Sequence, residues 1–154
     1  DYFVSGLKIA LACDHRGFEL KSKVAEFLKQ KDYQVVDCGS YNNNSSDYPD
    51  FMFPAAEKVA KGECRFAIGV CYTGIGSAIA ANKVQGVRAA LVHNMKEAEL
   101  SRAHNDANML ILGSGFLDSN LMIPIIDKWL NTPFEGGRHE HRVNKIKFYE
   151  QKCG

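Results

Sequence analysis

Cys71 stands between an apolar run and a glycine turn, where a thiol is well placed to act as a base. The segment from Gly69 to Lys83 reads GVCYTGIGSAIAANK, so the turn also opens a helix. Such a turn presents unpaired backbone N–H groups and the positive end of a helix dipole, which favour an anion, a thiolate included. A buried cysteine without chemistry is an equally good interpretation of this segment alone. The spacing fits neither GxGxxG nor GxxxxGK[ST], which argues against a nucleotide site.

Two further polar groups follow apolar runs or end helices. Asp14 and His15 come directly after the first apolar run, with Gly17 allowing a sharp turn. The pair suits proton handling or hydroxyl recognition, although a helix cap and a loop histidine explain it as well. His104 and Asn105 end a helical segment, where a histidine more often stabilises the helix dipole than takes part in catalysis.

Arg138 and Arg142 are spaced to act together on one phosphate. They are four residues apart, so both guanidinium groups lie on one face of a helix, unless that face is simply solvated. The neighbouring His139 and His141 are two apart and point away from each other. No acid or cysteine nearby completes a zinc set, so we expect no metal site.

Alternating strands and helices position these residues. Short apolar runs predict five strands, over Lys8–Cys13, Gln34–Cys38, Arg65–Cys71, Arg88–His93 and Met109–Gly113. Helical spacing predicts six helices: over 18–28, around Pro54, from the glycine turn to about Val84, over Asn94–His104, over Leu121–Leu130, and from Arg138 onward. Pro54 is expected in the first turn of the second helix, and Asn94 is expected to cap the fourth. Nearly all-apolar strands joined by helices predict an α/β fold, a three-layer α/β/α Rossmann-like sandwich with a five-stranded parallel sheet.

In such sheets the ligand crevice lies beyond the carboxyl ends of the strands. Four segments are predicted to meet there: Asp14-His15, the loop ending in Asp47-Tyr48, Cys71 with Thr73, and His93.

Composition narrows the class of protein. A length of 154 residues fits one domain, which we place at 8–154 behind an extension at 1–7. A net charge of +1 gives no reason to expect a nucleic-acid or membrane partner. The five cysteines are odd in number and contain no CxxC pair, which disfavours disulfides and zinc. Neither a membrane span nor a signal-peptide pattern is visible, so we expect a cytoplasmic protein.

Five motifs, in order, resemble the type B ribose-5-phosphate isomerases, in the family that includes allose- and galactose-6-phosphate isomerases. They are ACDHRGF, SDYPDF, Cys-x-Thr-Gly-x-Gly with IAANK, LSRAHNDAN and EGGRHEHRV, spread over residues 8–151. The resemblance implies a Rossmann-like fold, no cofactor, and interconversion of ribose 5-phosphate and ribulose 5-phosphate in the non-oxidative pentose phosphate pathway. It also implies a homodimer, or a dimer of dimers, with active sites shared between subunits.

The resemblance assigns roles residue by residue. Cys71 would move a proton between C2 and C1, while Thr73, the backbone of Gly74, Ile75, Gly76 and Ser77, and the side chain of Asn82 would hold the enediolate. His104, helped by Asp14, would open the furanose ring; Tyr48 and Asn105 would position the sugar hydroxyls; His15, Arg138 and Arg142 would contact the phosphate.

Three positions distinguish this chain within the resemblance. Ser77 stands where some relatives carry a glutamate base, which fits a cysteine branch. Gly115 replaces an arginine that is common in the phosphate clamp, and Tyr72 replaces the usual glycine beside the base. A six-carbon sugar-phosphate isomerase and a non-catalytic sugar-phosphate-binding module remain as alternatives.

Overall fold

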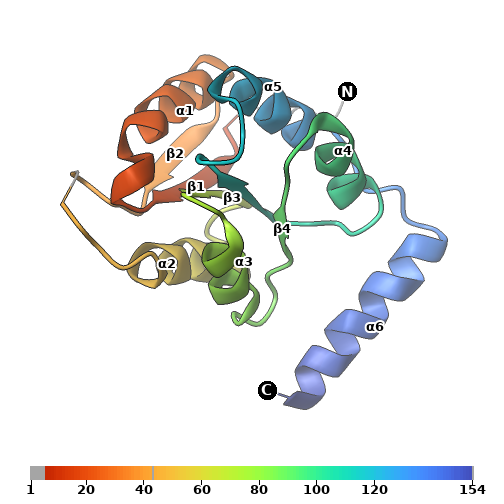
Figure 1. Cartoon of the computed structure of the whole chain (residues 1–154). Helices are drawn as coiled ribbons and strands as arrows, with labels where there is room; N and C mark the ends of the chain where they lie inside the picture. Colours follow the sequence, from red (N-terminus) through yellow and green to blue (C-terminus); the bar gives the residue numbers. More distant parts are fainter. Residues whose placement is uncertain (1–5, 43, 154) are drawn as a thin grey trace.

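Five parallel strands form the central sheet of the computed structural model, which describes residues 6–42 and 44–153 (Figure 1). The strands are β1 (Lys8–Cys13), β2 (Gln34–Asp37), β3 (Phe66–Cys71), β4 (Ala89–Leu91) and β5 (Met109–Gly113), in the order β2-β1-β3-β5-β4. All four pairings are parallel. The predicted five-stranded parallel sheet is therefore confirmed.

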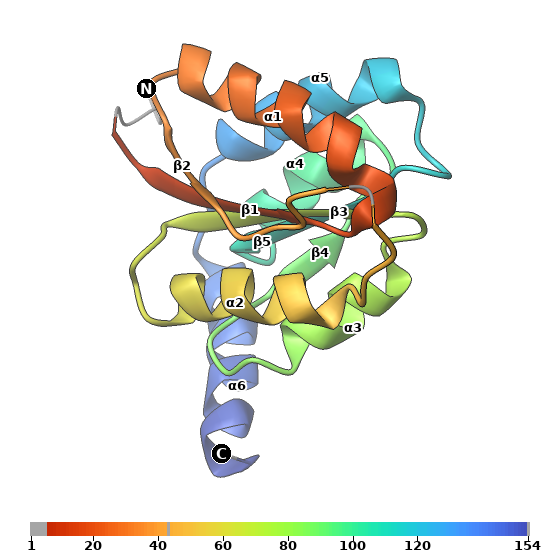
Figure 2. The ribbon, with the colours of Figure 1, turned by 90° about the vertical axis from the view of Figure 1, so that its left-hand side faces the viewer.

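Helices cover both faces of the sheet, which gives three layers (Figure 2). On one face α1 (Phe18–Gln30), α4 (Met95–Ala103) and α5 (Ser119–Leu130) bury a core that includes Leu28, Ala98 and Trp129. On the other face α2 (Pro49–Ala60) and α3 (Ile75–Asn82) bury a second core around Met52 and Ile111. Because helices cover both faces of the sheet, its central strands do not alternate between buried and exposed residues. Every residue of β3 and β5 is buried.

Most predicted boundaries agree with the structure to within two residues, and the helix cap is confirmed. The Asn94 side chain accepts a hydrogen bond from the Glu97 amide at 2.8 Å, as an N-cap should. The prediction of Pro54 in a first turn was wrong, because α2 begins earlier and Pro49 occupies its first position. The fourth strand is also shorter than predicted and leaves His93 two residues beyond its end.

A sixth helix, α6 (Arg138–Cys153), begins where predicted and extends away from the rest of the molecule (Figure 1). Of its described residues only His139 and Val143 are buried. The apolar side chains of Ile146, Phe148 and Tyr149 are more than half exposed. No helix within 6–42 and 44–153 has the length and apolarity needed to cross a membrane.

The strand order locates the crevice of the sheet. The chain passes from β1 to β2 on one side and then returns to place β3 on the other side of β1. Ligands of open α/β sheets bind where the order reverses, beyond the carboxyl ends of the strands. In this fold that point lies between Cys13 of β1 and Cys71 of β3.

Candidate active site

The Cys71 thiol is held by two donors from the turn that follows it. The Gly74 amide donates to Cys71 Sγ at 3.1 Å, and the Ser77 hydroxyl donates to the same sulfur at 2.9 Å. Ser77 is fully buried and Cys71 is 5% exposed, so the contacts are shielded from water. Gly74 reaches the sulfur from a left-handed conformation with φ of 81°, which favours glycine. The two contacts stabilise negative charge on sulfur.

The first turn of α3 supplies further donors beside this thiol. The Thr73 hydroxyl accepts from the Ile75 amide at 3.1 Å, while the amides of Gly76 and Ser77 belong to a first helical turn. Amides in that turn lack intrahelical carbonyl partners, and the helix dipole makes the turn electropositive. These groups can hold an oxyanion next to Cys71.

Tyr48 reaches the same turn from the start of α2. A Cβ atom at Gly76 would collide with the Tyr48 hydroxyl oxygen, so this glycine allows the phenol to lie directly on the turn. Tyr48 is partly exposed and therefore faces the solvent side of the crevice. The predicted hydroxyl-positioning residue is thus brought to the glycine turn that follows the predicted base.

Asp14 and His15 lie on the neighbouring strand end. The Asp14 amide donates to the Val70 carbonyl at 3.2 Å, which places Asp14 beside the end of β3, and its carboxylate accepts from the Gly17 amide at 3.1 Å. The Ser46 amide donates to His15 Nδ1 at 3.2 Å, so the other ring nitrogen of a neutral His15 carries the proton.

His104 and its neighbours occupy the other end of the sheet. The strand register pairs Cys71 with Gly113 and Ala67 with Met109, so four residue steps of β5, about 13 Å, separate the two ends. His104 follows α4, which returns the chain to the amino end of β5. Within one chain, therefore, His104 and Asn105 do not reach Cys71, and His104 does not reach Asp14.

His104 forms a cluster with two residues that sequence reasoning did not single out as its partners. Its ring stacks on that of His139, with centroids 4.0 Å apart and 11° between the planes. Glu135 Oε1 lies 3.8 Å from His104 Nε2 and 3.6 Å from His139 Nε2. Burial and the adjacent His104 both lower the pKa of His139. Arg138 and Arg142, on the same helix, are exposed.

The local sequence contains part of the signal for this cluster. Glu135 and His139 are only four residues apart, so they are close in the sequence although Glu135 lies in the loop before α6. The pairing of Glu135 with His104 has no local signal, because a backbone hydrogen bond from the Glu135 amide to the Ala103 carbonyl at 3.0 Å brings the two segments together. The sequence predicted that no acid completes a ligand set with His139 and His141. In the structure the acid beside His139 is Glu135, which precedes α6, and the other histidine of the cluster is His104 instead of His141.

Two predicted residues are engaged with local structure. The Asn82 amide donates to the Ala89 carbonyl at 2.9 Å and accepts from the Ala89 amide at 2.8 Å, which joins α3 to β4. The seven residue steps from Ile75 to Asn82 span about 10 Å of helix, so Asn82 lies at the end of α3 away from Cys71. His93, the other strand-end histidine, contacts Glu97 at 3.2 Å.

Tyr72 and Gly115, the two positions at which this chain differs from the residues common in the family it resembles, are in contact. A Cβ atom at Gly115 would lie 2.6 Å from Cζ and 2.7 Å from Cδ1 of Tyr72. Tyr72 also packs edge-on against Phe116, with ring centroids 5.7 Å apart. The Tyr72 ring therefore occupies the space of a side chain at residue 115.

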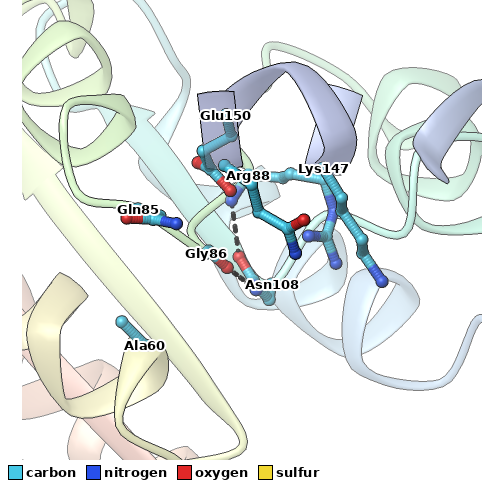
Figure 3. Close-up of a pocket in the computed structure, with 8 residues that line it drawn as sticks. Ala60, Gln85, Gly86, Arg88, Asn108, Lys147 and Glu150 are labelled. Atoms are coloured by element: carbon cyan, nitrogen blue, oxygen red, sulfur yellow. Dashed lines mark hydrogen bonds between the residues drawn. The ribbon is translucent and has the colours of Figure 1, made fainter. Parts of the chain in front are cut away.

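A polar hollow of about 540 Å³ lies away from Cys71, where α6 passes the amino ends of the strands (Figure 3). Arg88, Lys147 and Glu150 contribute to its wall. Asn108 joins the loops behind it, accepting from the Arg88 amide at 2.7 Å and donating to the Gly86 carbonyl at 2.9 Å. None of the predicted site residues lines this hollow.

Comparison with known proteins identifies the family of this chain. Residues 9–146 match the family described as Ribose/Galactose Isomerase. The chain belongs to this family. It is 42% identical over 145 residues to the ribose-5-phosphate isomerase B of Escherichia coli, covering 94% of this chain and 97% of that protein. A putative sugar phosphate isomerase of Rickettsia conorii is 45% identical over 139 residues, which cover 90% and 96% of the two chains.

Solved structures of the family share the fold. The ribose-5-phosphate isomerase B of Clostridium thermocellum superposes with a TM-score of 0.93 at 48% identity, covering 96% of this chain and all of that one. The enzyme of Mycoplasma genitalium, solved with bound ribulose-5-phosphate, gives a TM-score of 0.92 at 45% identity, covering 96% and 99%. The resemblance inferred from five ordered motifs is confirmed, and so is the Rossmann-like fold.

Proposed function

We propose that this protein is an aldose-ketose isomerase that interconverts ribose 5-phosphate and ribulose 5-phosphate, with Cys71 as the base. The observation that carries the proposal is the pair of donors on Cys71 Sγ, at the topological switch point and beside the open first turn of α3. The family supplies the reaction class, because its relatives include ribose-5-phosphate isomerases B. The same proposal places the enzyme in the cytoplasm, and its five free thiols are in keeping with this.

The chemistry needs a base and an oxyanion site together. A proton on carbon beside a carbonyl is weakly acidic, so removing it from C2 requires a positioned base and donors aimed at the developing enediolate. In the proposed reaction the Cys71 thiolate accepts the C2 proton and returns it to C1. The amides of Gly76 and Ser77 hold the enediolate oxygen, and one such donor contributes on the order of 3 kcal/mol.

We further propose that each active site is built from two chains. Cys71, Tyr48 and Asp14 gather at the carboxyl ends of the strands, whereas His104 and the arginines of α6 gather at the other end. A twofold dimer that places one end against the other completes two sites at once. The exposed apolar side chains of α6, such as Phe148 and Tyr149, support burial of this helix against a second copy.

In the shared site each chain contributes different residues to the reaction. His104 of one chain opens the furanose ring, and Arg138 and Arg142 of that chain hold the phosphate with His15 of the other. Bidentate guanidinium groups suit a phosphate, and their exposure leaves them available to a ligand. Both hydrogen bonds of Asn82 serve the backbone of Ala89, so we propose a smaller part for Asn82 than the resemblance implied.

One comparison of substrates tests this function. Ketose formation is measured with ribose 5-phosphate and with allose 6-phosphate, in the presence of a chelator. We expect kcat/KM for ribose 5-phosphate to be higher by at least about tenfold, since an ill-fitting extra group costs about 1 to 3 kcal/mol. A preference for allose 6-phosphate would assign the six-carbon reaction. Binding of both sugars without turnover would identify a non-catalytic binding module.

A further inference from the structure

The cluster of His104, Glu135 and His139 has the composition of a transition-metal site. Two imidazoles and one carboxylate form the ligand set of several zinc enzymes, in which a fourth position stays open to solvent. The three ligand atoms lie within 4.8 Å of one another.

The spacing of these atoms suits a metal better than it suits hydrogen bonds. The distances of 3.8 Å and 3.6 Å from Glu135 Oε1 to the two Nε2 atoms exceed the hydrogen-bond range. Two ligands with bonds near 2.1 Å on a tetrahedral zinc ion are separated by about 3.4 Å. The two distances to Glu135 therefore need only a few tenths of an ångström of adjustment. The stacked imidazole planes leave the two Nε2 lone pairs nearly parallel, so a shared ion also requires the His104 ring, whose side chain is 37% exposed, to turn out of the stack.

The backbone brings the ligands together before any ion binds. His104 ends α4, and the hydrogen bond from the Glu135 amide to the Ala103 carbonyl fixes Glu135 beside it. Another backbone hydrogen bond, from the His139 amide to the Gly136 carbonyl at 3.1 Å, fixes the start of α6. His139 is 8% exposed, whereas the Glu135 side chain is 59% exposed, so one ligand is fixed and another is free to adjust.

We propose that His104, Glu135 and His139 bind a divalent transition metal, zinc by preference, and that the bound ion inhibits the enzyme. The binding part stands on this geometry alone, whereas inhibition rests on the proposed role of His104 in ring opening. A metal on Nε2 of His104 occupies the lone pair that the imidazole would use to take or give a proton. The site regulates the reaction and takes no step in it.

Nearby charges set the strength of binding. The guanidinium groups of Arg138 and Arg142 act electrostatically on His139, so a cation binds against two positive charges. The affinity is accordingly lower than that of a structural zinc site, as a reversible inhibitor requires.

The experiment measures zinc binding to the intact, metal-free protein by calorimetry, without substrate. Glu135→Gln and His139→Gln remove one ligand each, and His141→Gln is the matched control, because this exposed histidine is on the same helix outside the cluster. We expect one zinc ion per chain in the wild type and the control. Each ligand variant should lose at least about tenfold in affinity. Glu135→Gln changes an exposed side chain and tests the site even if His139→Gln fails to fold.

Two further measurements separate this proposal from the proposed function. Zinc binding must persist in Cys71→Ala, which excludes the thiol as the main ligand. Zinc should inhibit isomerisation by the wild type and His141→Gln, with the inhibition constant at least about tenfold higher in Glu135→Gln. Zinc binding in a chain without isomerase activity would remove the function and leave the site. Equal affinity in the wild type and Glu135→Gln, or loss of binding in Cys71→Ala, would overturn the site.

Discussion

The phenol ring of Tyr72 fills the volume in which any side chain at residue 115 would lie. Gly115→Ala should therefore displace a ring that also packs on Phe116, at a cost of about 1 kcal/mol in the free energy of unfolding. Tyr72→Ala removes the obstacle, so adding Gly115→Ala to it should cost close to nothing. Denaturant unfolding of the four chains gives the coupling energy. Additive effects of the two changes would show that the ring is not the obstacle.

Cys71→Ala should remove the base while leaving the fold in place. We expect kcat to fall by at least about a hundredfold, the usual contribution of a positioned acid-base group. Cys153→Ala, which changes an exposed cysteine at the end of α6, should keep full activity. Steady-state kinetics with ribose 5-phosphate check this. A Cys71→Ala enzyme with more than about a tenth of the wild-type turnover would point to another base.

Mixing two inactive chains tests the shared active site. One carries Cys71→Ala and the other carries both Arg138→Ala and Arg142→Ala. With random exchange about half the dimers are mixed, and each has one intact site of its two, so roughly a quarter of wild-type activity should return. Co-expression or mild denaturation allows the exchange. If mass spectrometry detects mixed dimers and the activity stays at the level of the parents, these arginines do not complete the site of Cys71.

Removal of metal should not lower the reaction rate. The proposed chemistry uses a thiol, backbone amides and imidazole, so dialysis against a strong chelator should leave kcat unchanged or higher. The comparison is the same enzyme before dialysis, assayed at equal concentration. A loss of activity that a divalent ion restores would make the metal a cofactor.

Stability should fall as the pH rises into the range where cysteines ionise. Burial raises the pKa of Cys13, the fully buried last residue of β1, so the folded state favours the protonated thiol. The unfolded chain loses this proton first, at a pKa near 8.5, so the free energy of unfolding falls as pH rises above about 8. Urea unfolding between about pH 7 and 10 measures the slope.

A variant isolates the contribution of this thiol. Cys13→Ala should lower stability at every pH through lost packing, yet show a shallower decline above about pH 8. An unchanged slope would mean that other groups cause the decline, with Cys38 and Cys64 as the next candidates, since burial raises the pKa of both.

The sequence by itself determined the helices and strands and the position of the candidate base at one end of the sheet. Strands and helices follow from apolar runs and helical spacing, and the cap at Asn94 follows from hydrogen bonds within three residues. The placement of Cys71 before a helix N-terminus is equally local. These features depend on interactions between residues that are close in the chain, so they can be predicted from the amino-acid sequence.

Only the tertiary structure decided which residues meet across long stretches of chain. Glu135 joins His104 because the end of α5 leads the chain back past the end of α4, and Tyr72 meets Gly115 because β3 and β5 are adjacent. The parallel pairing of β3 with β5 also set Cys71, at the carboxyl end of β3, and His104, before the amino end of β5, at opposite ends of the sheet. Such contacts depend on the order of the strands and on where the chain reverses direction after a helix. The local propensities of the residues predict neither.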